Sequence, residues 1–307
     1  MKVLVTGGAG FIGRHTVRAL LREGSRVTVV DDFTSSKRDH MLEFSAHPGF
    51  DLIEADASDD KQLAHAFASA CPDAVVHLAG LVSVPKSFEE PEESRRLNVD
   101  AAEQAADIAA RYDCARFVFA SSAAVYGDLA DMPLREDAVL PHALSPYGQH
   151  KAEAEQKLMA RFDEVMSCIS MRYFNVYGKG QPVDSPYSGV ITRFVDCARR
   201  RAPLLVFGDG EQTRDFVHVE DVALVNAKAA FGVLVPGIYN VCNGTGTSLN
   251  ELISLLRARY PETVVQHQPS RQGEIRHSLG RSEKLASALG EWSPISFAAG
   301  IAGLLDD

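Results

Sequence analysis

Cysteine is scarce in this sequence, and the spacing of the few cysteines excludes two classes of small protein. Only five of the 307 residues are cysteine, and no two of them are separated by just two residues. Widely spaced cysteines are typical of buried thiols in a reducing compartment, whereas close pairs mark zinc sites and disulfide frameworks. We therefore expect neither a metal site nor disulfide bonds.

Long hydrophobic runs are also missing. No stretch of 18 consecutive apolar residues occurs, and the apolar run that follows Met1 and Lys2 ends at Gly7. The first observation argues against a membrane-spanning helix, and the second against the hydrophobic core of a signal peptide. We expect a cytoplasmic protein with no membrane partner.

An excess of positive charge is absent as well. The chain has 31 lysine and arginine residues against 41 aspartate and glutamate residues, which gives a net charge of -10. Without a basic face, nucleic acid is not an expected partner, although a local basic pocket for a phosphate group remains open. What the chain does have is 46% hydrophobic residues, enough for one large domain or two coupled domains.

Short β-branched runs alternate with longer stretches of helical spacing. The predicted strands cover residues 2–6, 26–31, 51–56, 74–79, 116–121 and 165–173. The predicted helices between them cover residues 12–24, 61–70, 92–112 and 145–162. Several of these strands are apolar almost throughout, as in parallel sheets buried on both faces. The pattern predicts an α/β fold with a Rossmann-type doubly wound parallel sheet.

The character of the chain changes near residue 173. Residues 175–189 are rich in glycine, proline and serine, and the elements that follow are shorter and more mixed. We interpret this part as a smaller C-terminal α/β lobe that faces the substrate.

A glycine-rich turn follows the first predicted strand. Gly7, Gly10 and Gly13 lie between this strand and the next predicted helix. Such a turn needs a residue free of Cβ strain, lets the backbone approach a pyrophosphate, and places that group at the N-terminus of a helix. The pattern in this context predicts a dinucleotide site.

Asp31 ends the second predicted strand, 18 residues after Gly13. A carboxylate there can accept hydrogen bonds from a ribose diol and would repel a 2′-phosphate, which favours NAD over NADP. Lys37 and Arg38 follow closely and could hold such a phosphate, but the usual exposure of these residue types favours a solvated loop.

Tyr147 and Lys151 are four residues apart, so they share one face of the helix predicted to begin near Pro146. A tyrosine that acts as a base near neutral pH needs a pKa shift of about three units, or about 4 kcal/mol. A lysine one turn away and a cationic nicotinamide both stabilise the phenolate. Alone this spacing is ordinary, but the glycine turn and the serine that ends RFVFASS favour an active site.

Together these motifs resemble the extended short-chain dehydrogenases/reductases, and specifically the NAD-dependent sugar-nucleotide epimerase/dehydratase family. The motifs cover nearly the whole chain and are VTGGAGFIG, HLAGLVSVPKSF, SSAAVYGD, SPYGQHK, RYFNVYG, GDGEQTRDFVHVEDV and SRQGEIR. The resemblance is closest to the UDP-glucose/UDP-galactose 4-epimerases. It implies NAD as cofactor, a UDP-sugar as substrate, and a homodimer formed through helices at residues 92–111 and 146–162.

The resemblance also implies a division of the chain. Residues 1–172, with about 216–243, would form the NAD-binding Rossmann domain. Residues 173–215 and 244–307 would form the lobe that binds the nucleotide sugar.

Site residues follow from the same resemblance. Ser122 would hydrogen-bond the sugar hydroxyl, Tyr147 would act as acid and base, and Lys151 would support Tyr147 electrostatically. The implied cofactor contacts are Gly7, Gly10, Phe11, Ile12, Gly13, Asp31, Asp32, Ser36, Asp56, Ala57, Leu78, Ala79, Gly80, Asn98, Tyr147, Lys151 and Tyr173. The implied substrate contacts are Ser83, Ser122, Asn175, Arg214, Arg271 and Ser278. The planar guanidinium groups of the two arginines suit a pyrophosphate.

Ala123 and Ala124 distinguish between branches of the family. Related 4,6-dehydratases have Thr-Asp-Glu-Val-Tyr-Gly at this point, and related decarboxylases keep a glutamate before Val-Tyr-Gly, whereas this chain has two alanines. A methyl group neither donates nor accepts a proton. We therefore predict a 4-epimerase that oxidises C4 to a transient 4-keto sugar and returns the hydride to its other face.

Ser278 bears on the breadth of the substrate range. It falls where related epimerases carry a bulky tyrosine beside C2, so a small residue leaves room for an N-acetyl group. We predict activity on UDP-GlcNAc and UDP-GalNAc as well as UDP-Glc and UDP-Gal. Val82 departs from the family pattern, because some of those enzymes have a lysine there.

Other functions remain open at this point. One group comprises a uronic acid epimerase, a decarboxylase, a reductase, or a dehydratase with its acid supplied elsewhere. A different class is a non-catalytic NAD-binding scaffold. The presence of Ser122, Tyr147 and Lys151 together argues against the scaffold.

Overall fold

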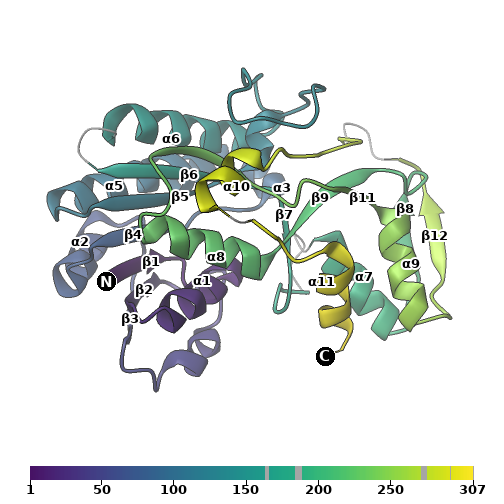
Figure 1. Ribbon diagram of the computed structural model, residues 1–307, viewed down its shortest axis with the longest axis horizontal. Coiled ribbons are helices and arrows are strands. Elements are labelled where there is room, and N and C mark those ends of the chain that lie inside the picture. Colours follow the sequence, from purple (N-terminus) through teal and green to yellow (C-terminus); the bar gives the residue numbers. More distant parts are fainter. Residues whose placement is uncertain (163–165, 184–188, 271–274, 291, 307) are drawn as a thin grey trace.

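A computed structural model describes residues 1–162, 166–183, 189–270, 275–290 and 292–306. The chain forms a large sheet covered by helices on both faces and a smaller lobe to one side (Figure 1). No helix in these described ranges is long and apolar enough to cross a membrane.

Seven parallel strands form the large sheet in the order β10-β6-β5-β4-β1-β2-β3. The strands are β1 (Lys2–Thr6), β2 (Arg26–Asp31), β3 (Phe50–Glu54), β4 (Ala74–His77), β5 (Arg116–Ser122), β6 (Ser167–Tyr173) and β10 (Gly237–Val241). The strand order reverses between β1 and β4, which opens a crevice at their carboxyl ends. The predicted doubly wound fold is confirmed.

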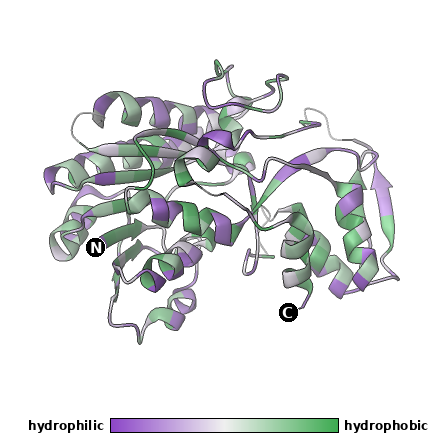
Figure 2. Cartoon of the chain, in the orientation of Figure 1, coloured by the Kyte–Doolittle hydropathy of each residue, from purple (hydrophilic) through white to green (hydrophobic). Residues whose placement is uncertain are grey.

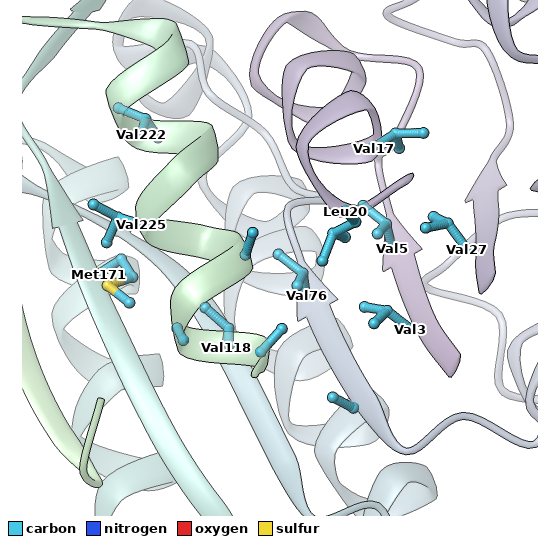
Figure 3. Packing of buried hydrophobic residues seen from close by; sticks show 14 of the residues in the cluster. Val3, Val5, Val17, Leu20, Val27, Val76, Val118, Met171, Val222 and Val225 are labelled. Atoms are coloured by element: carbon cyan, nitrogen blue, oxygen red, sulfur yellow. The ribbon is translucent and has the colours of Figure 1, made fainter. Parts of the chain in front are cut away.

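Helices cover both faces of this sheet. One face carries α1 (Phe11–Arg22) and α8 (Val219–Ala230), and the other carries α2 (Asp60–Ala70), α5 (Ala101–Arg111) and α6 (Pro146–Phe162). Side chains alternate along each strand, so Val3 and Val5 pack toward α1 while Leu4 packs toward α2. Figure 3 shows the first of these layers, with valines of the strands against Leu20 of α1 and Val225 of α8.

Burial on both faces explains why the strands are apolar almost throughout. Figure 2 shows the central strands coloured as hydrophobic, whereas the helices carry hydrophilic residues among hydrophobic ones. The predicted bounds of β1 and β2 are confirmed. β3 ends at Glu54 and β4 at His77, two residues earlier than predicted in each case, so Asp56 and Ala79 lie in loops.

The prediction of a single continuous helix over residues 92–112 is wrong in one respect. This segment consists of α4 (Pro91–Arg95), a π-helical segment at Arg96–Asp100, and α5. The side-chain amide of Asn98 in this segment donates to the carbonyl groups of Ser94 and Leu81. A side chain that bonds the carbonyl four residues earlier competes with the helical ladder, and such single-turn bulges are frequent at functional sites.

The smaller lobe contains two short sheets. A three-stranded sheet consists of β7 (Asn175–Tyr177), β9 (Thr213–His218) and β11 (Gly246–Ser248), and a two-stranded sheet consists of β8 (Leu204–Phe207) and β12 (Val265–Gln268). Three helices pack on them, namely α7 (Val190–Arg199), α9 (Leu249–Arg259) and α11 (Phe297–Leu305). A core that includes Phe194, Val206 and Leu252 holds these elements together.

One helix of the C-terminal part lies outside this lobe. Residues 244–307 are predicted to belong to the lobe, but α10 (Glu283–Leu289) packs on β10 of the large sheet. Leu285 is fully buried in the same hydrophobic cluster as Val241. The C-terminal segment therefore crosses back to the large sheet before it ends in α11.

Candidate active site

The glycine turn after β1 is packed so closely that larger residues do not fit. Gly7 has φ +67, and a Cβ added to Gly13 would lie 2.2 Å from the carbonyl oxygen of Gly7. α1 begins directly after Gly10, which makes no side-chain capping bond. The first N–H groups of α1 are therefore available to an anion. Phe11 and Ile12, two of the predicted cofactor contacts, are half-buried in this first turn.

Asp31 ends β2 beside this turn. Its carboxylate accepts hydrogen bonds from the N–H of Ala9 at 2.9 Å, from the N–H of Phe33 at 3.0 Å and from the Ser36 hydroxyl at 2.8 Å. These bonds fix the carboxylate at the crevice, where a ribose diol would lie. Arg38, the nearby cation that could hold a 2′-phosphate, pairs with Glu54 instead.

The remaining predicted cofactor residues occupy the neighbouring loops. Asp32 turns its carboxylate toward Thr34, and Asp56 accepts from the N–H and the hydroxyl of Ser58. Ala57 is buried, and Leu78 and Ala79 continue from β4 into the crevice, half-buried. Tyr173 at the end of β6 is buried and its hydroxyl donates to Asn226 at 2.7 Å.

Asn98 provides a test of whether NAD fits. Its side chain is 1% exposed, and its Oδ1 has no hydrogen-bond partner. A Cβ added to Gly80 would lie 2.7 Å from that oxygen and 3.6 Å from Nζ of Lys151. An unpaired buried acceptor is costly, so its presence beside a cradle that only glycine fits indicates a site shaped for a ligand. The chain's residues fit a dinucleotide at this crevice.

Tyr147 and Lys151 lie on the first turns of α6, as predicted. They are 9% and 4% exposed, respectively. Nζ of Lys151 donates to the carbonyl of Ala120 at 2.8 Å and lies 4.8 Å from the ring centroid of Phe119. Burial raises the pKa of Tyr147, while a hydrogen bond from Ser122 opposes this rise, and burial lowers the pKa of Lys151 to about 7.

These two shifts have one physical cause. Each side chain on its own is driven toward its neutral form because the pocket excludes water. A phenolate beside an ammonium group is neutral overall, so the two groups stabilise each other's charged forms. Burial therefore disfavours either charge on its own, and a charged Lys151 makes ionisation of Tyr147 less costly.

Ser122 is held beside Tyr147 by close backbone packing. Ser122 ends β5, and its Oγ accepts the N–H of Ala124 as the cap of a short 3₁₀ helix, η3 (Ala123–Tyr126). Gly148 follows Tyr147, and a Cβ there would lie 2.6 Å from the carbonyl oxygen of Ala124. This close approach brings the start of α6 to the serine turn. The catalytic residues implied by the sequence thus meet at one point.

Two further residues that support this site were not identified from the sequence. Ser87 lies in α3 (Val84–Glu89), and its buried hydroxyl accepts the N–H of Tyr147 at 3.1 Å. Asp215 in β9 accepts N–H groups from Asn243, Gly244 and Gly280. Asp215 lies within the motif GDGEQTRDFVHVEDV, which was the available signal for it.

The predicted substrate residues gather around β9 and α3. Asn175 in β7 donates to the carbonyl of Asp215 at 3.1 Å, and Arg214 donates to the carbonyls of Thr213 and Arg276. The N–H of Ser278 donates to the carbonyl of Thr213 at 3.1 Å, so Ser278 lies beside Arg214. Ser83 caps α3 through the N–H of Lys86. Arg271 lies outside the described residues.

A doubly wound sheet with a glycine turn at its crevice, a half-buried Ser122, and buried Tyr147 and Lys151 defines a nicotinamide-dependent oxidoreductase type of active site. Residues 3–242 match the NAD dependent epimerase/dehydratase family, and the chain belongs to this family. NAD is therefore its cofactor, as predicted.

Individual relatives agree with this assignment. The UDP-glucose 4-epimerase of Bacillus subtilis is 32% identical over 312 residues, which cover 94% of this chain and 91% of that protein. The crystal structure of UDP-glucose 4-epimerase from Thermotoga maritima with UDP-glucose has a TM-score of 0.91 and 31% identity, and covers 100% of this chain and 98% of that one. A UDP-N-acetylglucosamine 4-epimerase from Methanobrevibacter ruminantium, in complex with UDP-N-acetylmuramic acid, has a TM-score of 0.90 and 31% identity over 99% and 98% of the two chains.

Gly13→Ala tests the cofactor cradle. The added methyl group would meet backbone atoms of Gly7 and Gly8 and would push α1 away from the turn. We expect the purified variant to retain several-fold less NAD than the unchanged protein, measured as nucleotide released on denaturation. The control is Gly303→Ala in α11, where an added Cβ meets no atom within 4 Å. Equal NAD content in the two variants would contradict the role of this turn.

Proposed function

We propose that this chain catalyses 4-epimerisation of UDP-hexoses, interconverting UDP-Glc and UDP-Gal. The observation that carries the proposal is the meeting of half-buried Ser122 with buried Tyr147 and Lys151, beside a 3₁₀ turn in which Ala123 and Ala124 carry only methyl groups. The names of the relatives from Bacillus subtilis and Thermotoga maritima support it.

Ser122, Tyr147 and Lys151 have distinct roles in this reaction. Tyr147 takes the proton from O4 of the sugar, and the Ser122 hydroxyl hydrogen-bonds the same oxygen and orients it. Lys151 offsets the charge of the phenolate from one turn away. Bound NAD supplies a reversible hydride acceptor for C4. The 4-keto sugar then rotates in the pocket, the hydride returns to the opposite face of C4, and Tyr147 returns the proton to O4, so no net oxidation or reduction occurs.

The alanines limit what else is done to the sugar. Ala123 packs against a buried cluster that includes Val125, Phe174 and Cys242. A carboxylate at Ala123 or Ala124 would be needed on this turn to move protons at C5 and C6. Dehydration and decarboxylation are the alternatives raised by the family resemblance. The carboxylate that they would use on this turn is replaced here by Ala123 and Ala124.

Substrate binding is proposed for the residues around β9. The guanidinium group of Arg214 can pair with the pyrophosphate of a UDP-sugar, as can that of Arg271. Asn175 lies beside β9 through its bond to Asp215, and Ser83 caps α3. Val82, where some related enzymes carry a lysine, is 70% exposed and adds no charge to the site.

A panel of UDP-, dTDP- and GDP-sugars, followed by NMR, tests the proposed reaction. We expect UDP-Glc and UDP-Gal to reach the same equilibrium from either side without consumption of added NADH. Tyr147→Phe, which lacks the base, is the control and should show no turnover. A 4-keto-6-deoxy product, loss of CO2 from UDP-glucuronate, or stoichiometric use of NADH would each contradict the proposal, and inactivity toward every sugar would favour the scaffold.

Activity on UDP-GlcNAc and UDP-GalNAc is proposed from Ser278. Its small side chain lies beside β9, next to Arg214. The likeness to the Methanobrevibacter ruminantium enzyme supports this substrate range. Ser278→Tyr should lower kcat/KM for the acetamido sugars by at least about tenfold, while kcat/KM for UDP-Glc changes little. Contacts in a pocket discriminate between substrates of different size on this scale. Ser254→Tyr, an exposed position on α9, is the control. Equal loss on both kinds of sugar would contradict the proposed role of Ser278.

A homodimer is proposed through the outer faces of α5 and α6. That surface carries the ion pairs Lys157–Glu103 at 2.8 Å and Arg161–Asp107 at 2.7 Å. If the same charges also pair with those of a second copy, salt screens that attraction, so we expect dissociation to increase with ionic strength in sedimentation velocity experiments. Lys157→Glu should weaken the dimer more than Lys228→Glu on the opposite face of the sheet. A monomer under every condition would contradict the proposal.

The cytoplasm is the proposed location. Cys114, Cys168 and Cys242 are buried thiols, as is common for proteins of a reducing compartment. Recovery of the protein outside the soluble cytoplasmic fraction after cell fractionation would contradict this placement.

A further inference from the structure

We propose that Arg172 is a positioning residue, which together with Glu155 and Tyr126 fixes the spacing between Ser122 and Tyr147. The inference rests on the proposed 4-epimerase function. It concerns side chains that belong to neither the cofactor nor the substrate contacts named above. We call these three side chains the Arg172 bracket.

One arm of the bracket joins β6 to α6. Nε of Arg172 donates to both carboxylate oxygens of Glu155, at 3.2 and 3.1 Å, and Nη2 donates to Oε1. The two side chains are 2% and 3% exposed. The Ser170 hydroxyl donates to Oε2 of Glu155 at 2.8 Å. Glu155 is thus tied to the sheet by a forked, buried ion pair.

The other arm joins β6 to the serine turn. Nη1 of Arg172 donates to the hydroxyl of Tyr126 at 2.8 Å, and the guanidinium lies 4.8 Å from the centroid of the Tyr126 ring. The Tyr126 hydroxyl donates in turn to Oδ1 of Asn240 in β10 at 2.7 Å. Tyr126, which is 1% exposed, is therefore fixed at both its hydroxyl and its ring.

The two arms end on the two elements that carry the reaction. Glu155 is eight residues after Tyr147 in α6, on the same face of the helix. Tyr126 is the last residue of η3, the turn that Ser122 caps. Near the reacting groups, α6 and η3 touch where Gly148 meets the carbonyl of Ala124. The bracket supplies a second point of attachment, and two points fix the angle between the elements.

A buried ion pair is weak support for stability, because removing two charges from water costs about as much as their attraction returns. A fully satisfied polar network, by contrast, holds its members in one arrangement. The bonds of Arg172, Glu155 and Tyr126 satisfy the guanidinium on both sides. The structure therefore favours a geometric role over a purely stabilising one.

The effect on catalysis follows from the contact between Ser122 and Tyr147. The Ser122 hydroxyl lowers the pKa of Tyr147 against the rise caused by burial. If η3 rotates relative to α6, this hydrogen bond weakens and the pKa of Tyr147 rises. Loss of the bracket should then lower kcat and move the acid limb of its pH profile to higher pH. Binding of the UDP group should change little, and so should KM.

Tyr126→Phe is the main test, because it removes only the hydroxyl between Arg172 and Asn240. We expect kcat for UDP-Gal to fall about tenfold, within the range for displacements of about 1 Å, with KM and NAD content within about twofold. The acid limb of the kcat profile should shift to higher pH. The matched control is Tyr239→Phe, a buried tyrosine whose hydroxyl donates to the carbonyl of Val235.

Arg172→Lys provides a second test, because lysine keeps the charge but cannot bond both arms at once. We expect a similar fall in kcat and the same displacement of the acid limb. Thermal unfolding shows whether each variant is folded. An unchanged pH profile and kcat in folded Tyr126→Phe, or an equal change in Tyr239→Phe, would overturn the inference. Inactivity of the unchanged protein would instead overturn the proposed function, so the two failures are distinguishable.

Discussion

The burial of Tyr147 and Lys151 is the constraint on which the rest of the site depends. Both side chains lie almost out of reach of water, and burial pushes the pKa of each toward the neutral form. A separated charge in such a pocket is costly, whereas an adjacent pair of opposite charges is tolerated when its geometry is fixed. Proton transfer at the sugar therefore requires α6 to be held rigidly against β5 and the turn that follows it.

The surrounding fold provides this rigidity from several directions. The carbonyl of Ala120 holds Lys151, and Ser87 in α3 holds the N–H of Tyr147. Parallel strands bring their carboxyl ends to one edge, so groups from β1, β4, β5 and α6 converge there. At the same place, η3 presents methyl groups and no carboxylate. The chemistry proposed for this chain is limited to C4 because neither Ala123 nor Ala124 can remove another proton from the sugar.

Much of this architecture could be predicted from local patterns. β1 and β2 were predicted with their observed bounds because β-branched and other apolar residues fill them, as strands buried on both faces require. The glycine turn, Asp31 and the Tyr147–Lys151 spacing were recognisable because each depends on residues close together in the sequence. The family assignment confirms the fold and the cofactor, whereas the roles of the individual substrate residues remain predictions.

Other features depend on contacts that no local pattern contains. The π-helical segment arises where Asn98 bonds Leu81, 17 residues away, and Ser87 meets Tyr147 across 60 residues. Asp215 accepts hydrogen bonds from N–H groups up to 65 residues away. α10 packs on the large sheet although it follows elements of the smaller lobe in the sequence. Hydrophobic periodicity reports which face of an element is buried and gives no information about its partner.

The account states that one hydrogen leaves C4 of the sugar and returns to the same carbon. Conversion of UDP-Glc labelled with deuterium at C4, in unlabelled water with excess unlabelled NAD, measures this directly. The account predicts that the UDP-Gal formed keeps all of its deuterium at C4. Loss of the label to water or to the pool of free cofactor, or its appearance at another carbon, would contradict it.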